Sequence, residues 1–361
     1  MSESSGLKTN NALHVAFIGS GPVSMLKAIN LAAAHPHYTI TILDSASQIG
    51  GAWYTDLSPK GHEIECGCHI WSYVPKAYRL IEKELDIKLF AVHPKPVFVG
   101  KKMNLPYSLK NTVDTYKAFF KTLASFKWKN LRNFRTDPNM NFRIFFKYNK
   151  YPKTGSPELL HALQQKLNAQ SNIIQLLNKD IKSVNVSSKV KLETSAGNME
   201  FDKVFFTYVS RLSSIVMNGI PISIQTKRVD YIHFLIRLNK PLIKKISYWR
   251  FINDPVIHRI TDISYQTNYS ENLLLIGIKE NAYKSTEEAT LLEHAKELLV
   301  RHNLMDQSTS LVILKTHIFP TYYLSDETIT SLKKDSEKFC FVHTTDLMHG
   351  VHALIAQEKA I

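Results

Sequence analysis

Short apolar runs and a helical segment alternate most clearly near the start of the chain. Residues Leu13–Ile18 form a short, mostly apolar run that predicts a buried strand. Residues Met25–Ala34 are small and apolar enough to predict a closely packed helix, and Tyr38–Leu43 mixes β-branched and apolar residues as a second strand does. Together the three segments predict a strand–helix–strand unit with a glycine-containing turn after the first strand.

The remaining hydrophobic pattern predicts further helices and many short strands. Ser156 and Pro157 are expected to start one helix as its cap and first residue, and Ser285 with Glu288 is expected to form a capping box for another. The predicted helices are Pro75–Leu85, Thr112–Leu123, Glu158–Leu167, Thr286–His302 and Leu347–Lys359. The predicted strands are Val97–Met103 (a hairpin around Gly100), Ile173–Leu177, Ile181–Val186, Val190–Thr194, Lys203–Thr207, Tyr231–Leu238, Ile246–Ile252, His258–Ile263, Leu273–Ile278 and Phe339–His343.

The turn after the first strand carries the chemistry that is easiest to interpret. It reads Gly19-Ser20-Gly21-Pro22-Val23-Ser24, a G-x-G-x-x-S pattern placed between a strand and a helix. Gly19 allows the tight turn, and Gly21 lets the backbone approach a pyrophosphate because it has no Cβ. The free N–H groups and the positive dipole end of the following helix favour an anion there. Ser24 replaces the usual third glycine and is still small enough for close packing.

An acidic residue ends the second strand. Asp44, followed by Ser45, stands where a carboxylate can accept hydrogen bonds from an adenosine ribose, and its charge argues against a 2′-phosphate. The turn, the helix and this acid together predict a dinucleotide site; a doubly wound fold that has lost its ligand is the alternative.

A second glycine pair, Gly50-Gly51, follows this acidic strand end and is itself followed by Ala52 and Trp53. This arrangement resembles FAD enzymes of the glutathione-reductase type, and the resemblance implies that the backbone of this segment lies beside the ribityl-pyrophosphate part of FAD. FAD is therefore the expected cofactor, although a plain loop turn would also use two glycines.

Net charge and cysteine content favour some classes of ligand and cellular compartment and exclude others. Lys and Arg number 45 against 31 Asp and Glu, a net charge of +14 that suits an anionic ligand or a negatively charged surface. No zinc-finger spacing, RNP-type motif or basic helix repeat indicates nucleic-acid binding. The three cysteines, Cys66, Cys68 and Cys340, form no metal or disulfide framework and indicate a reducing compartment. Without a signal peptide or a membrane-length apolar run, we expect a cytoplasmic protein that can contact membranes peripherally.

The order of elements predicts an α/β protein with a discontinuous architecture. We expect a disordered tail at residues 1–11 and a Rossmann-like FAD-binding domain of the glutathione-reductase type at 12–70, 152–210 and 330–361. Residues 71–151 and 211–329 are expected to form an α+β substrate domain that contains an antiparallel sheet. Within it, the basic, aromatic segment 127–153 can line a substrate mouth, form a small core or bind single-stranded nucleic acid.

Several short motifs, taken in order, resemble one superfamily of FAD enzymes: the amine oxidases, protoporphyrinogen oxidases and UDP-galactopyranose mutases. The layout and length are most similar to the mutase. The motifs are Gly67-Cys68-His69-Ile70-Trp71, Gly100 through Leu105-Pro106-Tyr107 to Thr112, His258-Arg259-Ile260, Tyr322-Tyr323 and Asp346-Leu347-Met348. The chain departs from the mutase in lacking a tryptophan-glycine segment in the middle insert and a glycine-proline after Thr207.

The resemblance implies roles for residues outside the glycine turns. It puts His69 beside the flavin ring, where it tunes the flavin or moves a proton, although a turn residue is the plainer interpretation. It implies a cofactor contact for Met348 and backbone N–H donors to the flavin at Gly350 and Val351. It also implies a ribityl hydroxyl contact for Asp346, which can equally be the N-cap of the last helix.

The resemblance also implies residues that meet the substrate. Arg259 would clamp a carboxylate or phosphate, or form an ion pair with Asp254 or Asp262. Tyr322 and Tyr323 would contact the substrate or belong to an aromatic core.

The function expected from this set is an FAD-dependent oxidoreductase that takes a hydride from a small, anionic substrate. One alternative is a flavin-dependent isomerase of a nucleotide sugar, similar to UDP-galactopyranose mutase. The other is a flavoprotein that has lost catalysis and serves as a binding module.

Overall fold

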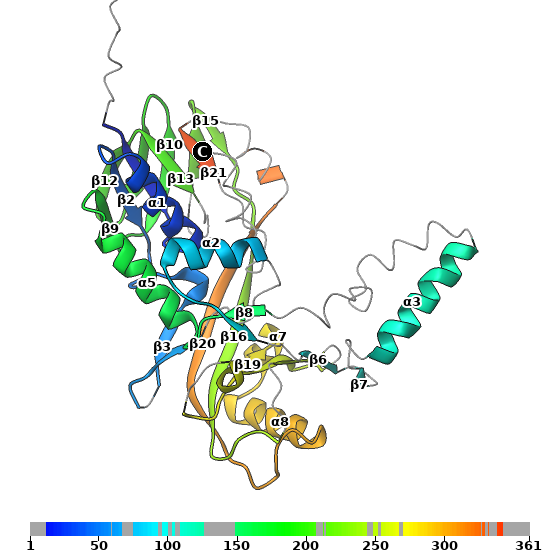
Figure 1. Ribbon diagram of the computed structural model, residues 1–361. Helices are drawn as coiled ribbons and strands as arrows, with labels where there is room; N and C mark the ends of the chain where they lie inside the picture. The colour runs from blue at the N-terminus through cyan, green and yellow to red at the C-terminus, as the bar shows by residue number, and fades with distance from the viewer. Residues whose placement is uncertain are drawn as a thin grey trace, which may run out of the picture.

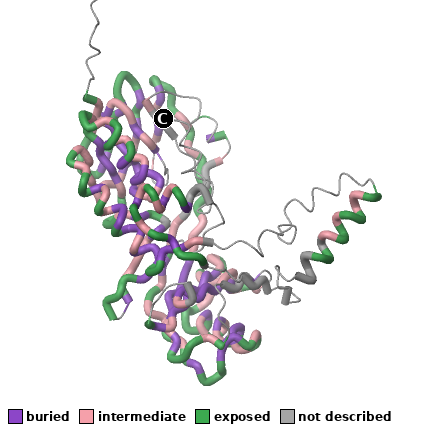
Figure 2. The backbone as a smooth tube through the Cα atoms, viewed as in Figure 1, coloured by how far each residue is buried: buried purple, intermediate pink, exposed green. Residues whose placement is uncertain are grey.

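The computed structural model describes residues 12–58, 60–66, 75–92, 96–99, 103–104, 109–125, 149–206, 212, 214–243, 248–251, 254–266, 270–325, 327–328, 331 and 338–341. These residues form a mixed α/β fold with three main sheets (Figure 1). In Figure 2, buried residues run through the layers of these sheets, whereas the described part of helix α3 (Leu109–Ala124) shows only intermediate and exposed residues.

The first sheet is parallel and contains the predicted strand–helix–strand unit. Its strand order is β21-β13-β1-β2-β9, and every pairing in it is parallel. The strands are β1 (His14–Ile18), β2 (Thr39–Leu43), β9 (Ile173–Leu176), β13 (Lys203–Phe206) and β21 (Phe339–Phe341). Parallel strands that are buried on both faces consist of nearly continuous apolar residues. Most of these strands could therefore be predicted from the sequence.

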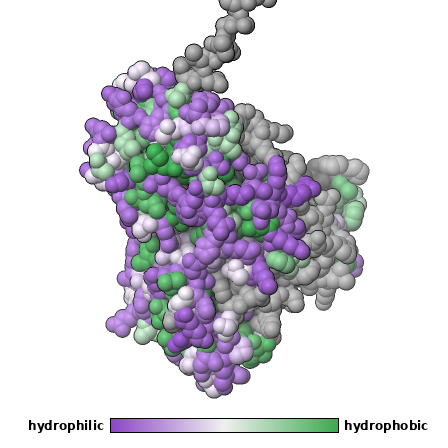
Figure 3. All heavy atoms as spheres, turned by 60° about the vertical axis from the view of Figure 1, so that its left-hand side comes forward, coloured by the Kyte–Doolittle hydropathy of each residue, from purple (hydrophilic) through white to green (hydrophobic). Residues whose placement is uncertain are grey.

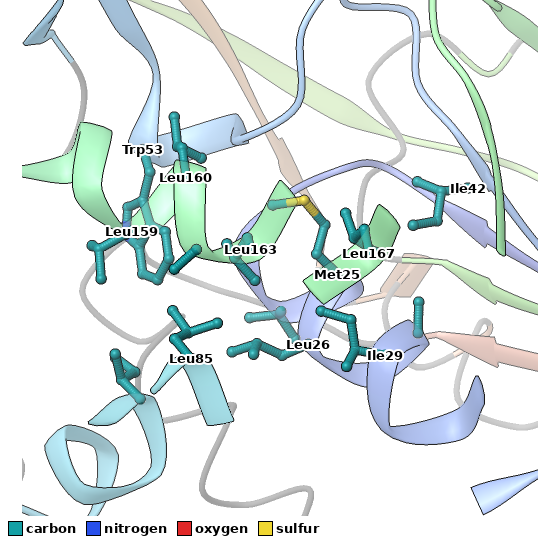
Figure 4. Close-up of a cluster of buried hydrophobic side chains, with 14 of the residues drawn as sticks. Met25, Leu26, Ile29, Ile42, Trp53, Leu85, Leu159, Leu160, Leu163 and Leu167 are labelled. Atoms are coloured by element: carbon teal, nitrogen blue, oxygen red, sulfur yellow. The ribbon is translucent and has the colours of Figure 1, made fainter. Parts of the chain in front are cut away.

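Helices cover one face of this parallel sheet. Helices α1 (Pro22–Ala34), α2 (Pro75–Leu85) and α5 (Ser156–Asn168) place their apolar side chains in one core with the strand residues Phe17, Ile40 and Ile42. Figure 4 shows Met25, Leu26 and Ile29 of α1 beside Leu163 and Leu167 of α5. Burying each such side chain contributes about 1.5–3 kcal/mol, so this layer fixes the start of α1 firmly.

A second sheet covers the opposite face. Its strand order is β12-β11-β10-β14-β15, with a parallel pairing between β10 and β14 and antiparallel pairings elsewhere. It packs Val184, Leu192 and Ile215 against Ala16, Ile18 and Phe206 of the parallel sheet. The strands are β10 (Ile181–Val186), β11 (Val190–Thr194), β12 (Gly197–Phe201), β14 (Ser214–Met217) and β15 (Ile220–Ile222).

The third sheet has seven strands in the order β20-β16-β19-β18-β17-β6-β7. Its pairings are antiparallel apart from β17 with β6. Helices α7 (Glu280–Ser285) and α8 (Glu288–Arg301) accompany it, and α8 packs Leu291, Ala295 and Leu299 on one of its faces. The strands are β6 (Pro96–Val99), β7 (Met103–Asn104), β16 (Thr226–Leu238), β17 (Tyr248–Phe251), β18 (Ile257–Asp262), β19 (Leu273–Ile278) and β20 (Leu311–Leu324).

Short elements connect these layers. The 3-10 turn η1 (Gly51–Trp53) leads into the hairpin of β3 (Thr55–Leu57) and β4 (Glu63–Glu65), and β5 (Phe90–Val92) pairs with β8 (Asn149–Tyr151). Helix α6 spans Ile263–Gln266. None of the helices in the described part of the chain is long and apolar enough to cross a membrane.

Two predicted helix starts are wrong. Gly155, at φ 82°, is the N-cap of α5, and Ser156 is the first helical residue with its N–H donating to Glu65 Oε2 at 3.1 Å. Ser285 caps no helix start: it ends α7, and its Oγ donates to the Asn281 carbonyl at 2.9 Å, while Glu287 is the N-cap of α8. The predicted helix over Thr286–His302 therefore begins later, at Glu288.

The domain division stays a prediction, and the packing bears on its boundaries. Strands β14 and β15 lie beyond residue 210 yet pair in the sheet of β10. Helix α2 lies beyond residue 70 yet packs Tyr78, Ile81 and Leu85 into the core of α1 and α5. The predicted tail at residues 1–11 and the predicted final helix at Leu347–Lys359 lie outside the described residues.

Candidate functional site

The glycine turn after β1 is held by the acid at the end of β2. The Gly19 N–H donates to the Leu43 carbonyl at 2.8 Å, which ties the turn to the neighbouring strand. Ser20 is fully buried, and both its N–H and its Oγ donate to Asp44 Oδ2 at 2.6 Å. Charge-assisted hydrogen bonds of this kind are short and strong, so Asp44 fixes the shape of the turn.

The start of α1 offers an anion site beside this turn. Gly21 is the N-cap, Pro22 occupies the first helical position without an N–H, and no described side chain caps the helix end. The first turn carries no acidic residue. A Cβ added to Gly21 would meet no described atom within 4 Å, so the space in front of the turn is open. Open space, free N–H groups and a positive dipole end are what a pyrophosphate group requires.

The second glycine pair packs directly on the first turn. The Gly50 N–H donates to the Ser20 carbonyl at 3.0 Å. A Cβ added to Gly51 would lie 3.0 Å from the Gly21 Cα, and Gly51 has a φ of +49°. Gly51 needs to be glycine because the two segments approach more closely there than a side chain allows. The two glycine motifs, thirty residues apart in sequence, therefore form one cradle that fits the pyrophosphate part of a dinucleotide.

Residues around Asp44 complete the rim of this cradle. Asp44 Oδ1 accepts a hydrogen bond from the Ala46 N–H at 2.8 Å, with the exposed Ser45 between them. Each carboxylate oxygen thus has a protein partner, and Oδ1, which accepts one hydrogen bond where Oδ2 accepts two, retains capacity for a further donor. The predicted ribose contact of Asp44 stays a prediction. In addition, the same carboxylate holds the glycine turn in place through Ser20.

Three of the predicted cofactor residues are buried behind the cradle. Ser24 is fully buried, Val23 is buried at the start of α1, and Trp53 is 3% exposed. The Trp53 ring lies against Leu159 and Leu160 in the helix-layer core (Figure 4). The side chains of Val23 and Trp53 thus support the two loops from the core side, which leaves their backbone for a ligand. Nothing is described of the Ala52 side chain.

A second group of polar residues lies on one face of the seven-stranded sheet. Strand register places His317 of β20 opposite His233 of β16, His233 opposite Gly277 of β19, and Gly277 opposite Arg259 of β18. Residues directly opposite one another in neighbouring strands share a face of the sheet. We call His233, Arg259, Gly277 and His317 the histidine face.

Gly277 leaves room within the histidine face for a neighbouring ring. A Cβ added to Gly277 would lie 2.3 Å from His258 Cε1, so the His258 imidazole occupies the place of the missing side chain. His258 stands where β18 shifts register between Ile257 and Arg259. Such a bulge turns a side chain away from its regular direction, which accounts for both His258 and Arg259 lying near Gly277.

The chain that leaves the glycine cradle runs directly to this face. Tyr54 follows Trp53, and its ring centroid lies 5.7 Å from that of His317 and 5.8 Å from that of Phe319. Asp56 of β3 forms an ion pair with Lys315 of β20 and lies 3.8 Å from His317 Nε2. The hairpin of β3 and β4 therefore connects the cradle with the histidine face.

The ionisable groups of this connection have shifted pKa values. Burial lowers the pKa of His317, and the charge of Asp56 opposes that shift without cancelling it. Burial alone would raise the pKa of Asp56, but hydrogen bonds from Lys315 and the Leu57 N–H hold it below the usual value. The hydrogen bond to Asp56 raises the pKa of Lys315, and burial raises that of Tyr54. At neutral pH the site therefore holds a neutral imidazole beside a paired carboxylate and ammonium.

A small apolar core joins the hairpin to the sheet. Ile64 and Cys66 of the hairpin pack with Leu235, Leu273 and Leu275 of the seven-stranded sheet. Burial raises the pKa of the Cys66 thiol, so this cysteine is an inert core residue. Among the residues the structure describes, no three His, Cys, Asp or Glu side chains are grouped to hold a metal.

The structure brings together only part of the predicted site. His69, Asp346, Met348, Gly350 and Val351 lie outside the described residues. Tyr322 and Tyr323 belong to β20, and nothing is described of their side chains. Asp254, one predicted partner of Arg259, forms an ion pair with His294 at 2.9 Å. Sequence reasoning missed His233, His317 and Gly277, because their proximity arises from pairing between distant strands.

Comparisons with known proteins agree with this architecture. Residues 18–83 match the NAD(P)-binding Rossmann-like domain family, and no curated protein sequence matches the chain. Three solved structures share its fold over nearly the whole length. A reduced UDP-galactopyranose mutase is 13% identical, covers 97% of both chains and superposes with a TM-score of 0.65. A protein named as a protoporphyrinogen oxidase in Exiguobacterium sp. 255-15 is 12% identical, with 96% of this chain and 98% of that chain covered and a TM-score of 0.63.

A putrescine oxidase bound to putrescine is likewise 12% identical, with 96% of this chain and 97% of that chain covered and a TM-score of 0.63. At such identities the likeness shows the fold, and it confirms the α/β architecture with an antiparallel sheet that the sequence predicted. The chain thus has the fold that these three solved structures share, and its residues 18–83 match the NAD(P)-binding Rossmann-like domain.

Proposed function

We propose that this protein is an FAD-dependent oxidoreductase that acts on a small, anionic substrate by hydride transfer to the flavin. The observation that carries the proposal is the cradle, in which Gly51 packs against Gly21 while the side of Gly21 facing the start of α1 is open. NAD-binding loops do not usually carry the second glycine pair, so the cradle favours FAD. A reducing, cytoplasmic location accords with the buried Cys66 thiol.

In this proposal each part of the chain has a defined task. The start of α1 holds the pyrophosphate, and Asp44 keeps the turn in shape through Ser20. Bound FAD supplies a ring that accepts a hydride from the substrate. Arg259 on the histidine face holds a substrate carboxylate or phosphate in a two-pronged contact. His317, with its lowered pKa, is neutral at pH 7 and can accept a proton.

Flavin content and a single substitution test the cofactor. The purified protein should show flavin absorbance, and acid should release free FAD into the supernatant because the proposed binding is non-covalent. Gly21→Val should abolish the absorbance but leave a largely folded chain, since its side chain enters only the open space. Ala33→Val, at the exposed far end of α1, is the control and should bind FAD normally.

The outcomes also separate the alternatives. Loss of flavin absorbance on adding a reducing substrate supports the oxidoreductase, whereas turnover only after reduction by dithionite supports an isomerase similar to the mutase. A Gly21→Val protein with wild-type flavin content would remove the basis of the proposal. A wild-type protein that binds no FAD would leave the binding module as the function.

A further inference from the structure

Buried polar residues need a physical reason, whereas polar residues at the surface do not. Hydrophilic side chains cover most of the described surface on the side of the molecule that carries α5 (Figure 3). His233 and His317 of the histidine face, by contrast, are only 7% and 5% exposed. In the same part of the seven-stranded sheet, the ring of His258 lies directly on Gly277.

Gly277 is the residue of β19 that the strand itself does not explain. The other residues of Leu273–Ile278 are apolar and at most 1% exposed, and Gly277 is buried among them. Glycine weakens the interior of a strand, and Gly277 does not have the positive φ that would require it. The reason is space, because a Cβ at this position would lie 2.7 Å from His258 Nε2 and 2.8 Å from His258 Nδ1.

His258 is the extra residue of the bulge in β18. Ile257 pairs with Ile278 and Arg259 pairs with Gly277, so two steps along β18 correspond to one step along β19. An extra residue of this kind has no partner position in the neighbouring strand. Its side chain therefore needs a place of its own, and the bare backbone of Gly277 provides it.

The bulge also leaves His258 and Arg259 together on the histidine face. Ile257 and Ile260, the residues on either side of them, are both 0% exposed and belong to the core beneath α8. A regular strand with alternating sides would turn one of the two intervening residues toward that core. Here both remain partly exposed, and the His258 ring lies at 82° to that of His233, with 6.3 Å between the ring centroids.

We propose that Gly277 is a positioning residue for the anion site, because it accepts the His258 ring and thereby holds the bulge in the form that presents Arg259 to the substrate. This inference rests on the proposed function, in which Arg259 binds a substrate carboxylate or phosphate. With a methyl group at position 277 the His258 ring must move, since the three atoms nearest that methyl group all belong to the ring. The bulge then loses its anchor and Arg259 its orientation, while the core beneath α8 stays in place.

Binding of benzoate and of its uncharged analogue benzamide, measured by calorimetry on the full flavin-loaded chain, tests the proposal. Gly277→Ala should weaken benzoate binding by about tenfold. It should leave benzamide binding unchanged, because only the anion uses the charge of Arg259. Ile278→Val is the matched control: it changes the next residue of β19, which faces the core beneath α8, and should lower the melting temperature without changing either affinity.

His258→Ala keeps the test valid if Gly277→Ala fails to fold, since it removes the ring without adding volume. It should also weaken benzoate binding by about tenfold, and the double variant should bind no more weakly than either single variant, because both changes act through one contact. The positioning role is overturned if either single variant binds benzoate with wild-type affinity, if the two effects multiply in the double variant, or if benzamide binding falls in parallel. A wild-type protein that binds no benzoate would remove the anion site proposed at Arg259, and this inference with it.

Discussion

At the scale of single residues, Arg259 is the side chain that we propose to contact the substrate. Its register places it on the face of the sheet that also presents His233 and His317. The tyrosine that follows the glycine cradle reaches the same face through its ring contact with His317. An arginine in this position can hold a carboxylate through two parallel hydrogen bonds, a geometry that lysine cannot reproduce.

We therefore expect Arg259→Lys to weaken the binding of benzoate, used as a simple carboxylate probe and followed by perturbation of the flavin absorbance. Removing an arginine that makes a buried charge-assisted contact lowers the binding free energy by about 2–5 kcal/mol. The lysine variant should lose nearly as much binding free energy for benzoate. Flavin content and melting temperature should stay at the wild-type level.

Arg228→Lys is the matched control, because Arg228 is exposed and pairs with Asp230 on the same sheet. If Arg259→Lys instead unfolds the protein, Arg259 is a structural ion-pair residue. Unchanged benzoate binding would place the anion site elsewhere, and the basic segment 127–153 would then be the next candidate.

At the scale of elements, the start of α5 depends on a buried acid from another part of the chain. Glu65 of β4 accepts hydrogen bonds from the Ser156 N–H at 3.1 Å and from the Tyr151 hydroxyl at 2.5 Å. Burial raises the pKa of Glu65 to about 8, and the two hydrogen bonds offset only part of that shift. At neutral pH the carboxyl group is thus mostly protonated.

This shift predicts how stability depends on pH. The folded pKa of Glu65 exceeds its ordinary value of 4.5, so its contribution to stability is complete below about pH 4.5 and is lost as the pH rises through about 8. The slope can reach about 1.4 kcal/mol per pH unit within that window.

Glu65→Gln removes the titration and keeps an oxygen that accepts both hydrogen bonds. We expect its melting temperature, relative to wild type, to rise between about pH 5 and about pH 8 and to level off above that. The exposed control Glu293→Gln should show no such trend. Parallel pH profiles for wild type and Glu65→Gln would show that Glu65 is ionised in the folded protein.

The predictions were correct for elements whose sequence signal lies within the element itself. The G-x-G-x-x-S turn and the predicted helix Pro75–Leu85 carry their signals locally, and the structure contains both. The two predicted helix caps failed for different reasons. The Ser156 N–H is bound by the distant Glu65, and Ser156 is already helical, whereas the Ser285 hydroxyl bonds to the Asn281 carbonyl in the helix that precedes it. Strand β20 was missed because polar residues such as His317 interrupt its apolar pattern, and only pairing with β16 over thirteen positions explains it.

At the scale of the whole molecule, the small core of Ile64, Cys66, Leu235, Leu273 and Leu275 joins the cradle side to the seven-stranded sheet. Leu275 points into this joint, whereas its neighbour Leu274 points into the core beneath α8. Both side chains are 1% exposed. Substitutions at the two leucines therefore distinguish a loss of sheet stability from a loss of the contact between the sheet and the cradle side.

We expect Leu275→Ala and Leu274→Ala each to lower the free energy of unfolding by about 2–5 kcal/mol, the usual cost of a large cavity in a core. Only Leu275→Ala should release flavin, followed by its fluorescence, at a lower temperature than circular dichroism reports loss of secondary structure. Coincident transitions in both variants would show that the joint is not needed to hold the cofactor.

The order of strands also has a consequence for how the chain is made. The parallel sheet needs β21, which pairs with β13 through Phe206 and Phe341, and these residues are 135 positions apart. At about 5–20 residues per second, a ribosome adds that length in roughly 7–27 s. During this interval β1, β2, β9 and β13 can already be paired, but the outer edge of β13 is open. An open strand edge is a template for association with other chains. The nascent protein can therefore aggregate through the edge of β13 until β21 emerges and covers it.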